Sequence, residues 1–566
     1  MGTVSASRAE VGAIPADVDA NANESSPSGW SAPRVALVVF VAVEVIALPL
    51  LLYWGRHGWF TQDDWDFLSA RSIGSVDDLF RPHFQHWVTL PILPYRLLWT
   101  VVGIRSYLPY QAMIVVLHLT AAALLYAVMG RAGVRPWIAT IAAGAFVFFG
   151  SGAENIVVAF QITFVGALVF GLVQLLLADH DGPLAARDWL GLLAGLAALT
   201  CSGVGITMVV VVGGAVLLRR GLGGWRIALF HTVPLAGAYL LWLSLAPEGQ
   251  PAGNYHAQSV SQVWRFVVIG FEAAFARQGQ IPFLGFLLGG VLVAGLVLAL
   301  RGRGSWFPFG GLASSIALLG GALLFLVLTG IVRAGQGGLL FLLDQSGPER
   351  ARDSRYVYLI AAMALPALAI GADALITRWR YLAIPLGIVL LLGVPGNIHR
   401  LMDPGDLFGN SRATHAEIVA LPRLPLASQL RGSRRLVAIQ YPRFAQEGLT
   451  YGWLVAGAES GRIPDPGPIN KFVASTWTLR NFLVPTRVTR PVELRCDPAP
   501  ASSIRVLEKG DQLTIERGNV NITYVPLGGA PSLRTPPVKP STLEALAGPL
   551  RVRIVPVSEG VLLCSS

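Results

Sequence analysis

Charged residues are scarce in this chain. They make up 13% of its 566 residues, whereas hydrophobic residues make up 53%, and the mean hydropathy is +0.57. An average soluble domain carries about 25% charged residues. The scarcity excludes an ordinary soluble globular protein, and the excess of apolar residues predicts a protein that crosses a membrane several times.

Two further absences narrow the class. Residues 1–33 lack the apolar core of a secretory signal, which excludes a cleavable signal peptide, and their Ala, Ser, Asn and Pro predict a disordered cytoplasmic tail. The net charge is +10, but no basic patch is present. The basic residues are scattered over short loops between apolar stretches, which excludes a nucleic-acid partner and favours basic cytoplasmic loops.

The apolar residues are concentrated in eleven stretches, and about 20 such residues form a helix that crosses a bilayer. The predicted spans are 34–54, 108–130, 137–150, 156–178, 188–201, 203–218, 227–246, 281–300, 307–331, 356–376 and 381–395. Two of them, 137–150 and 188–201, are short. Together they predict an all-α membrane domain over residues 34–395.

Arginines in the short loops, such as Arg131, Arg135 and Arg187, predict the orientation. Basic loops stay in the cytoplasm, so the N-terminus is expected there, in the inner (plasma) membrane of a bacterium. The segments expected outside are 55–107, 247–280, 332–355 and the tail 396–566.

The tail 396–566 differs in composition from the membrane domain. Alternating runs such as 520–525 and 550–555 are separated by Gly and Pro, which predicts a small, mainly β extracytoplasmic domain. The tail holds Cys496 and Cys564, and outside the cell a disulfide between them is expected. The alternative is two unpaired buried thiols.

Three carboxylates, Asp63, Asp64 and Asp66, follow the first predicted span within four residues. Asp64-Trp65-Asp66 has the spacing of a metal-binding D-x-D motif used with nucleotide sugars, but such donors are cytoplasmic and this segment is expected outside. A second interpretation is general base catalysis, because a neighbouring carboxylate and an apolar margin raise one of the two pKa values. The third is a helix cap without chemistry.

The segment 55–107 also contains Arg81, His83 and His86, and an amphipathic stretch follows them. Two histidines, an arginine and three aspartates in one segment favour a polar site over isolated interfacial residues.

The segment resembles one known group of proteins. An acidic pair after the first span, the His-Trp-Val-Thr-Leu-Pro sequence at 86–91 and the Tyr-Arg-Leu sequence at 95–97 are similar to the GT-C superfamily of membrane glycosyltransferases, which includes protein O-mannosyltransferases, lipid A aminoarabinose transferases and actinobacterial arabinosyltransferases. The resemblance covers residues 34–395. It implies a polyprenyl-phosphate-linked sugar as donor, and Asp63 or Asp64, with Asp63 preferred, as the base that activates the acceptor.

A second element of the resemblance lies at 352–358, where the last outer segment enters a span. A guanidinium at a bilayer margin can form two parallel hydrogen bonds to a phosphate, although a snorkelling arginine has the same position. The resemblance implies that Arg355 and Tyr356 contact the donor phosphate. Further donor-binding candidates are Arg352, Arg81, His83 and His86, and the candidates for lining the cavity are Asp66, Glu154 and Gln161.

The expected acceptor is a hydroxyl of a glycan, a glycolipid or a protein of the envelope. Some GT-C proteins need a divalent metal and others do not, so Mg²⁺ or Mn²⁺ at Asp63 and Asp64 stays open. One rival is a transporter or flippase for a lipid-linked glycan, which predicts polar residues along a membrane path and an inverted repeat; neither is evident. The other rival is an inactive envelope scaffold.

Overall fold

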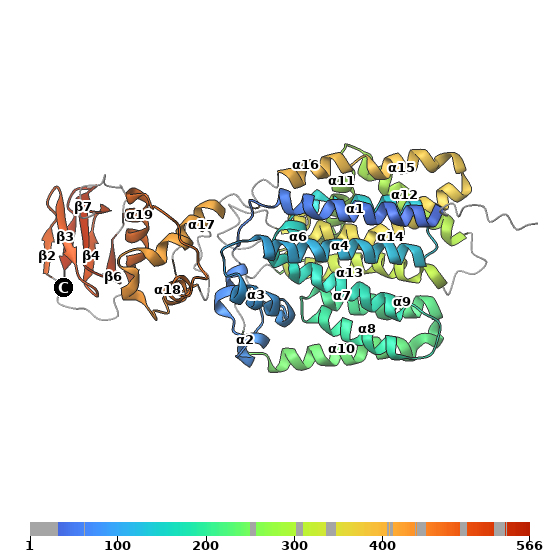
Figure 1. Ribbon diagram of the computed structural model, residues 1–566, viewed down its shortest axis with the longest axis horizontal. Coiled ribbons are helices and arrows are strands. Elements are labelled where there is room, and N and C mark those ends of the chain that lie inside the picture. Colours follow the sequence, from blue (N-terminus) through green and yellow to red (C-terminus); the bar gives the residue numbers. More distant parts are fainter. Residues whose placement is uncertain are drawn as a thin grey trace, which may run out of the picture.

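The computed structural model describes residues 32–61, 63–248, 256–301, 309–335, 347–403, 407, 411–435, 437, 449–486, 495–525, 538 and 540–565. The predicted tail 1–33 therefore lies outside the described residues except at its last two positions. A bundle of long helices forms one end of the molecule, and a domain that contains strands forms the other (Figure 1). The predicted fold class, a helical multi-span membrane protein with a small β-containing C-terminal domain, is confirmed.

Within the described residues, eight stretches are long and apolar enough to cross a membrane. Their helices are α1 (Ala32–Trp54), α4 (Leu108–Arg131), α7 (Ile162–Ala178), α10 (Trp225–Leu245), α12 (Leu284–Arg301), α13 (Ala313–Arg333), α14 (Ser354–Arg378) and the consecutive pair α15 (Ala383–Leu391) and α16 (Val394–Met402). The other three predicted spans correspond to α5 (Pro136–Val147), α8 (Ala186–Leu199) and α9 (Val204–Arg220). These have 12, 14 and 17 residues, so the count of eleven stays a prediction.

Helix α14 lies in the middle of the bundle (Figure 1) and is the most deeply buried of the eight stretches. Its Tyr358 hydroxyl lies 2.9 Å from Nδ1 of His118 on α4, and Nε2 of His118 donates to the Val147 carbonyl at 3.0 Å. Both nitrogens of this buried imidazole are therefore satisfied inside the bundle, as a polar group in a span requires.

The segment between α1 and α4 carries the acidic residues. It contains a π-helical turn, η1 (Asp66–Ala70), and two helices, α2 (Val76–Phe80) and α3 (Thr89–Val101). Ser75 caps α2, because its hydroxyl accepts a hydrogen bond from the Asp78 amide at 3.2 Å. Between α2 and α3, His83 and His86 exchange two backbone hydrogen bonds of 3.0 Å, which reverses the chain.

The C-terminal part begins with helices α17 (Ser411–Ala420), α18 (Tyr451–Glu459) and α19 (Lys471–Phe482), so strands occupy the region from Leu483 onward. The strands are β1 (Leu483–Thr486), β2 (Arg495–Pro498), β3 (Ser503–Leu507), β4 (Gln512–Arg517), β5 (Val520–Tyr524), β6 (Ser541–Ala545), β7 (Leu550–Pro556) and β8 (Leu562–Ser565). They form two antiparallel sheets, β1-β6-β4-β8-β2 and β3-β7-β5. Cys496 of β2 and Cys564 of β8 form a disulfide.

The C-terminal domain packs directly on the segment with the acidic residues, and the two share one apolar core. Trp453 of α18 stacks on Trp99 of α3 with ring centroids 4.4 Å apart, and the Ile104 amide donates to the Arg462 carbonyl at 2.9 Å. These contacts fix the domain beside the candidate site.

Candidate active site

Asp64 is fully buried and its carboxylate is already occupied. One oxygen accepts from the Thr61 amide (2.5 Å) and hydroxyl (2.8 Å), and the other accepts from the Tyr95 hydroxyl of α3. Burial raises the pKa of Asp64 to about 6, although the hydrogen bonds from Tyr95 and Thr61 oppose that rise. Asp64 therefore fastens the motif to α3 and offers little to a substrate.

Asp66 is also buried, and it is held by two cationic groups. Arg71 donates to its carboxylate through Nη2 at 2.8 Å and Nε at 3.1 Å, and Nδ1 of His83 donates at 2.8 Å. Burial alone would raise the pKa of Asp66, but the bond from His83 and the charge of Arg71 outweigh it, so the pKa lies below its usual range. Asp66 is therefore an ionised structural group.

Arg71 was not a candidate from the sequence. It is buried, and besides Asp66 it donates to the carbonyls of Asp78 (2.9 Å) and Pro82 (3.1 Å). The bond to Asp66 closes the short π-helical turn η1, whereas the bonds to Asp78 and Pro82 form only because the chain returns to Arg71 through and after α2.

His83 connects the buried pair to Asp63. Its Nδ1 is bound to Asp66, and its Nε2, which has no hydrogen bond, lies 3.7 Å from a carboxylate oxygen of Asp63. Burial lowers the pKa of His83, but the two aspartates outweigh burial and raise it to about 9. The side chain of Asp63 is 38% exposed. It is therefore the accessible carboxylate of the motif, and a charged imidazole faces it.

Arg355 is the second residue of α14, and its side chain is 37% exposed. Its guanidinium lies 3.8 Å from Glu154 and 3.6 Å from Asp353, both beyond hydrogen-bond length. Its Nε has no hydrogen-bond partner in the described residues. Gln161 donates to Glu154 at 2.6 Å, so this amide and this carboxylate stand next to the guanidinium.

Glu154 lies within electrostatic reach of Asp63. Burial raises the pKa of Glu154, the charge of Arg355 lowers it, and the charges of Asp353 and Asp63 raise it further. The structure thus brings Asp63, His83, Glu154 and Arg355 into one charged neighbourhood, although the chain separates them widely.

Other sequence candidates have different surroundings. Arg352 is held by Glu272 at 2.7 Å and Glu349 at 2.8 Å. Arg81 donates to the Ala70 carbonyl at 2.9 Å. Both arginines therefore already have protein partners, which leaves Arg355 as the less engaged guanidinium.

His86 and Tyr356 border the same region. His86 is half-buried, and burial, with the charges of Arg333, His83 and Arg355, lowers its pKa to about 4. Tyr356 is buried, with the Arg355 guanidinium 5.4 Å from its ring centroid. Tyr356 therefore supports Arg355 from the core side and is not an exposed anchor at the bilayer surface.

A metal ion needs several ligand atoms directed at one point. In the described part of the chain, no three His, Cys, Asp or Glu groups of the acidic motif lie close enough together to do this. The one group that does comprises Cys496, Glu516 and Cys564, and its two cysteines are joined in the disulfide. At the acidic motif, Asp63 has the only accessible carboxylate among its three aspartates.

No protein-family model and no curated protein sequence matches the chain. Among solved structures, it is similar to two crystal structures of ArnT from Cupriavidus metallidurans. The structure in the apo state has 15% sequence identity and a TM-score of 0.42, and the match covers 75% of this chain and 85% of that one. The structure bound to undecaprenyl phosphate has 14% identity and a TM-score of 0.43, with 74% and 84% covered.

Proposed function

We propose that the protein is a membrane glycosyltransferase that moves a sugar from a polyprenyl-phosphate carrier to a hydroxyl group of an envelope acceptor. One observation supports this proposal most strongly: an accessible carboxylate, Asp63, stands beside a fixed imidazolium and in the same charged neighbourhood as the half-exposed guanidinium of Arg355. A base and a phosphate-binding cation are the two groups that this transfer needs.

Asp63 is the proposed base. Asp64 and Asp66 are buried and hydrogen-bonded, whereas the side chain of Asp63 is 38% exposed and has His83 opposite it. His83 lies 3.7 Å from the Asp63 carboxylate, so a cationic group stands beside the proposed base without a hydrogen bond that would occupy it. Arg71 and Asp66 hold His83 in place.

Arg355 is proposed to receive the leaving phosphate. In the transfer, the acceptor oxygen bonds to the anomeric carbon, the bond from that carbon to the phosphate oxygen breaks, and the acceptor proton moves to Asp63. The polyprenyl phosphate leaves with one more negative charge than the donor. An arginine at that point stabilises the developing charge.

Replacement of Asp63 tests the proposal. In Asp63→Asn, transfer of radiolabelled sugar from a panel of polyprenyl-phosphate sugars should fall by about 10²- to 10⁴-fold, because the base is lost, while the thermal stability stays near that of the wild type. Asp77→Asn is the matched control, since Asp77 is exposed on α2 in the same segment.

The variant Asp63→Asn and a transport assay on the wild-type protein also separate the enzyme from the two rival functions, a transporter and a scaffold. Unchanged transfer in Asp63→Asn would refute the base. A protein that moves the lipid-linked sugar across proteoliposomes without consuming it would be a transporter, and one that does neither would be a scaffold.

A further inference from the structure

The carboxylate of Glu154 lies near Arg355 without a hydrogen bond to its guanidinium. Its Oε1 accepts from Nε2 of Gln161 at 2.6 Å, whereas Nη1 of Arg355 lies 3.8 Å from the same oxygen. A guanidinium and a carboxylate in a direct pair are about 2.8 Å apart. A movement of about 1 Å would therefore complete the pair, and the bond from Gln161 opposes that movement.

The backbone that carries Glu154 is fixed to the first turn of α14. The Ser354 hydroxyl accepts from the Glu154 amide at 3.4 Å and donates to the Ser151 carbonyl at 2.9 Å. The side-chain amide of Asn155 donates to the Arg355 carbonyl at 3.3 Å. Because the two backbones are joined in this way, rotation of the side chains decides whether Glu154 and Arg355 pair.

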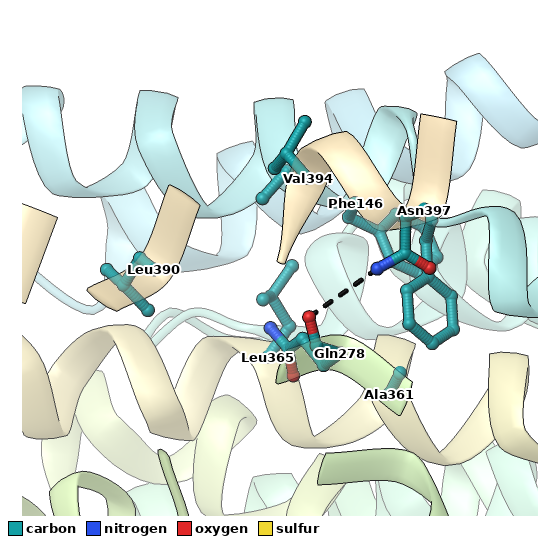
Figure 2. A pocket seen from close by; sticks show the side chains of 9 residues that line it. Phe146, Gln278, Ala361, Leu365, Leu390, Val394 and Asn397 are labelled. Carbon is teal, nitrogen blue, oxygen red and sulfur yellow. Dashed lines mark hydrogen bonds between the residues drawn. The ribbon is translucent and has the colours of Figure 1, made fainter. Parts of the chain in front are cut away.

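Asn397 of α16 holds the same turn from the opposite side. Its carbonyl oxygen accepts from the Ser151 amide at 2.9 Å, and its amide group donates to the Arg277 carbonyl at 3.1 Å. Figure 2 shows this amide group directed at the Gln278 carbonyl, at 3.5 Å. Asn397 is buried, so the turn that carries Glu154 is held between α14 and α16.

Gln161 is buried in η3 (Ala159–Gln161), immediately before α7. A carboxylate only accepts hydrogen bonds, so Gln161 has to direct its N–H toward Glu154. Its own carbonyl oxygen is then buried without a partner in the described residues, which costs stability. An apolar side chain of this size would avoid that cost, so the bond to Glu154 is what distinguishes Gln161 from a residue that only fills space.

Arg355 keeps hydrogen-bond donors available in this arrangement. Asp353 lies 3.6 Å from its Nη2, which is also beyond hydrogen-bond length. The Arg355 side chain is 37% exposed. A carboxylate paired directly with the guanidinium would occupy the donors that a phosphate needs.

We propose that Gln161 is a positioning residue that holds Glu154 away from Arg355 and so keeps the guanidinium available to the phosphate of the polyprenyl carrier. Without the bond from Gln161, Glu154 pairs with Arg355, and the carrier then has to displace a carboxylate. The identity of the anion rests on the proposed function, whereas the competition between Gln161 and Arg355 for Glu154 does not.

Carrier binding by the purified full-length protein tests the proposal. Undecaprenyl phosphate binding would be measured by native mass spectrometry without donor sugar or acceptor. Gln161→Leu should weaken binding about tenfold, because the phosphate then competes with an ion pair. Gln174→Leu is the matched control and should bind like the wild type. Gln174 is buried on α7, donates to the His231 carbonyl at 3.1 Å and also has a carbonyl oxygen without a partner in the described residues.

A Glu154→Gln background tests whether the effect of Gln161→Leu acts through the carboxylate. In that background Gln161→Leu should change binding by less than about twofold, because no carboxylate remains at residue 154 to pair with Arg355. In transfer assays, Gln161→Leu alone should raise the KM for the donor about tenfold at a nearly unchanged kcat, since the pair breaks when the donor binds. Equal weakening of binding in both backgrounds, or equal weakening by Gln161→Leu and Gln174→Leu, would overturn the proposal in favour of lost packing.

A structure of the Gln161→Leu variant tests the competition without any ligand. The Glu154 carboxylate and the Arg355 guanidinium should approach to about 2.8 Å, and a separation that stays near 3.8 Å would overturn the positioning role. A failure of the proposed function looks different, because Arg355→Gln would then bind the carrier as the wild type does, while the two side chains still approached each other in Gln161→Leu.

Discussion

At the scale of single residues, the adjacent carboxylates differ through what surrounds them. Asp64 is enclosed by Thr61 and Tyr95, whereas Asp63 extends to the surface opposite His83. Successive side chains in a helical turn point about 100° apart, so two identical neighbouring groups can acquire a structural and a chemical role. The proposed chemistry therefore depends on how rigidly the buried neighbours hold His83.

Arg71 is the residue on which that rigidity depends. Arg71→Met removes the main countercharge of buried Asp66, and we expect a loss of about 3–5 kcal/mol of stability. The thermal unfolding of the purified protein would show it. Arg105→Met is the control, because Arg105 is exposed and bonds only to nearby carbonyls.

A second substitution tests whether the unpaired charge of Asp66 causes this loss of stability. If an unpaired buried charge is responsible, Arg71→Met with Asp66→Asn should recover part of the lost stability. A double variant that is no more stable than Arg71→Met would contradict the electrostatic explanation and point to lost packing.

His83 gives stability a pH dependence with a defined sign. In the unfolded chain a histidine titrates near pH 6.5, whereas in the folded protein its pKa is about 9. Its contribution, about 3 kcal/mol, is complete below about pH 6.5, declines as the pH rises, and is lost above about pH 9. The melting temperature should therefore fall between pH 6.5 and 9.5, and His83→Gln should flatten this part of the profile.

At the scale of elements, the joint between α3 and the C-terminal domain requires a glycine. Gly103 has a φ of +64°, and an added Cβ would lie 2.1 Å from the Arg462 carbonyl oxygen. Gly103→Ala should therefore separate α18 from α3 and raise the sensitivity of the C-terminal domain to protease. The transfer rate should also fall, because Trp453 of α18 packs on Trp65 of the acidic motif.

Gly133 provides the comparison for that substitution. It has a φ of +80° with no atom within 4 Å of an added Cβ, so Gly133→Ala introduces the backbone strain, about 1 kcal/mol, without the clash. Equal protease sensitivity of the two variants would mean that strain, and not the contact with Arg462, explains the effect.

Element types were more predictable from the sequence than their partners. Long apolar runs and alternating strands depend on local periodicity, and β5 and β7 lie where the runs at 520–525 and 550–555 predict strands. The helices α17–α19 were not predicted from the sequence; α18 packs on α3 through Trp453 and Trp99. The pairings of Asp66 with His83 and of His118 with Tyr358 depend on a chain reversal and on helix packing that no local pattern encodes.

At the scale of the whole molecule, contacts constrain which helices cross the membrane. The turn between α8 and α9 touches the segment 55–107, since the Leu90 amide donates to the Thr200 carbonyl at 3.1 Å. The other end of the same helices reaches the end of α7, where Arg219 pairs with Asp179 at 2.8 Å. Both α8 and α9 therefore extend between the two ends of the bundle.

Helix α5 also connects opposite ends. Arg135, which precedes it, lies 3.7 Å from Asp373 near the end of α14, and Ser151, which follows it, accepts from Ser354 at the start of α14. Because α14 is long and apolar enough to cross a membrane, α5 would run from one side to the other with it. The three short helices together with the eight long stretches would then make eleven crossings.

Eleven crossings place the C-terminus opposite the N-terminus, and the contact between domains requires the same result. The C-terminal domain touches the segment 55–107 through Trp453 and Trp99, and that segment follows a single crossing, so both must lie on one side.

Reporter fusions test this arrangement. With the N-terminus in the cytoplasm, alkaline phosphatase fused after residue 566 should be active, and a fluorescent protein fused there should be dark. A fusion in the turn at 200–203 should behave like the C-terminal one. An active phosphatase at 566 with an inactive one at 200–203 would reduce the count to nine, and an inactive enzyme at both would put the acidic motif in the cytoplasm, where a nucleotide sugar becomes the expected donor.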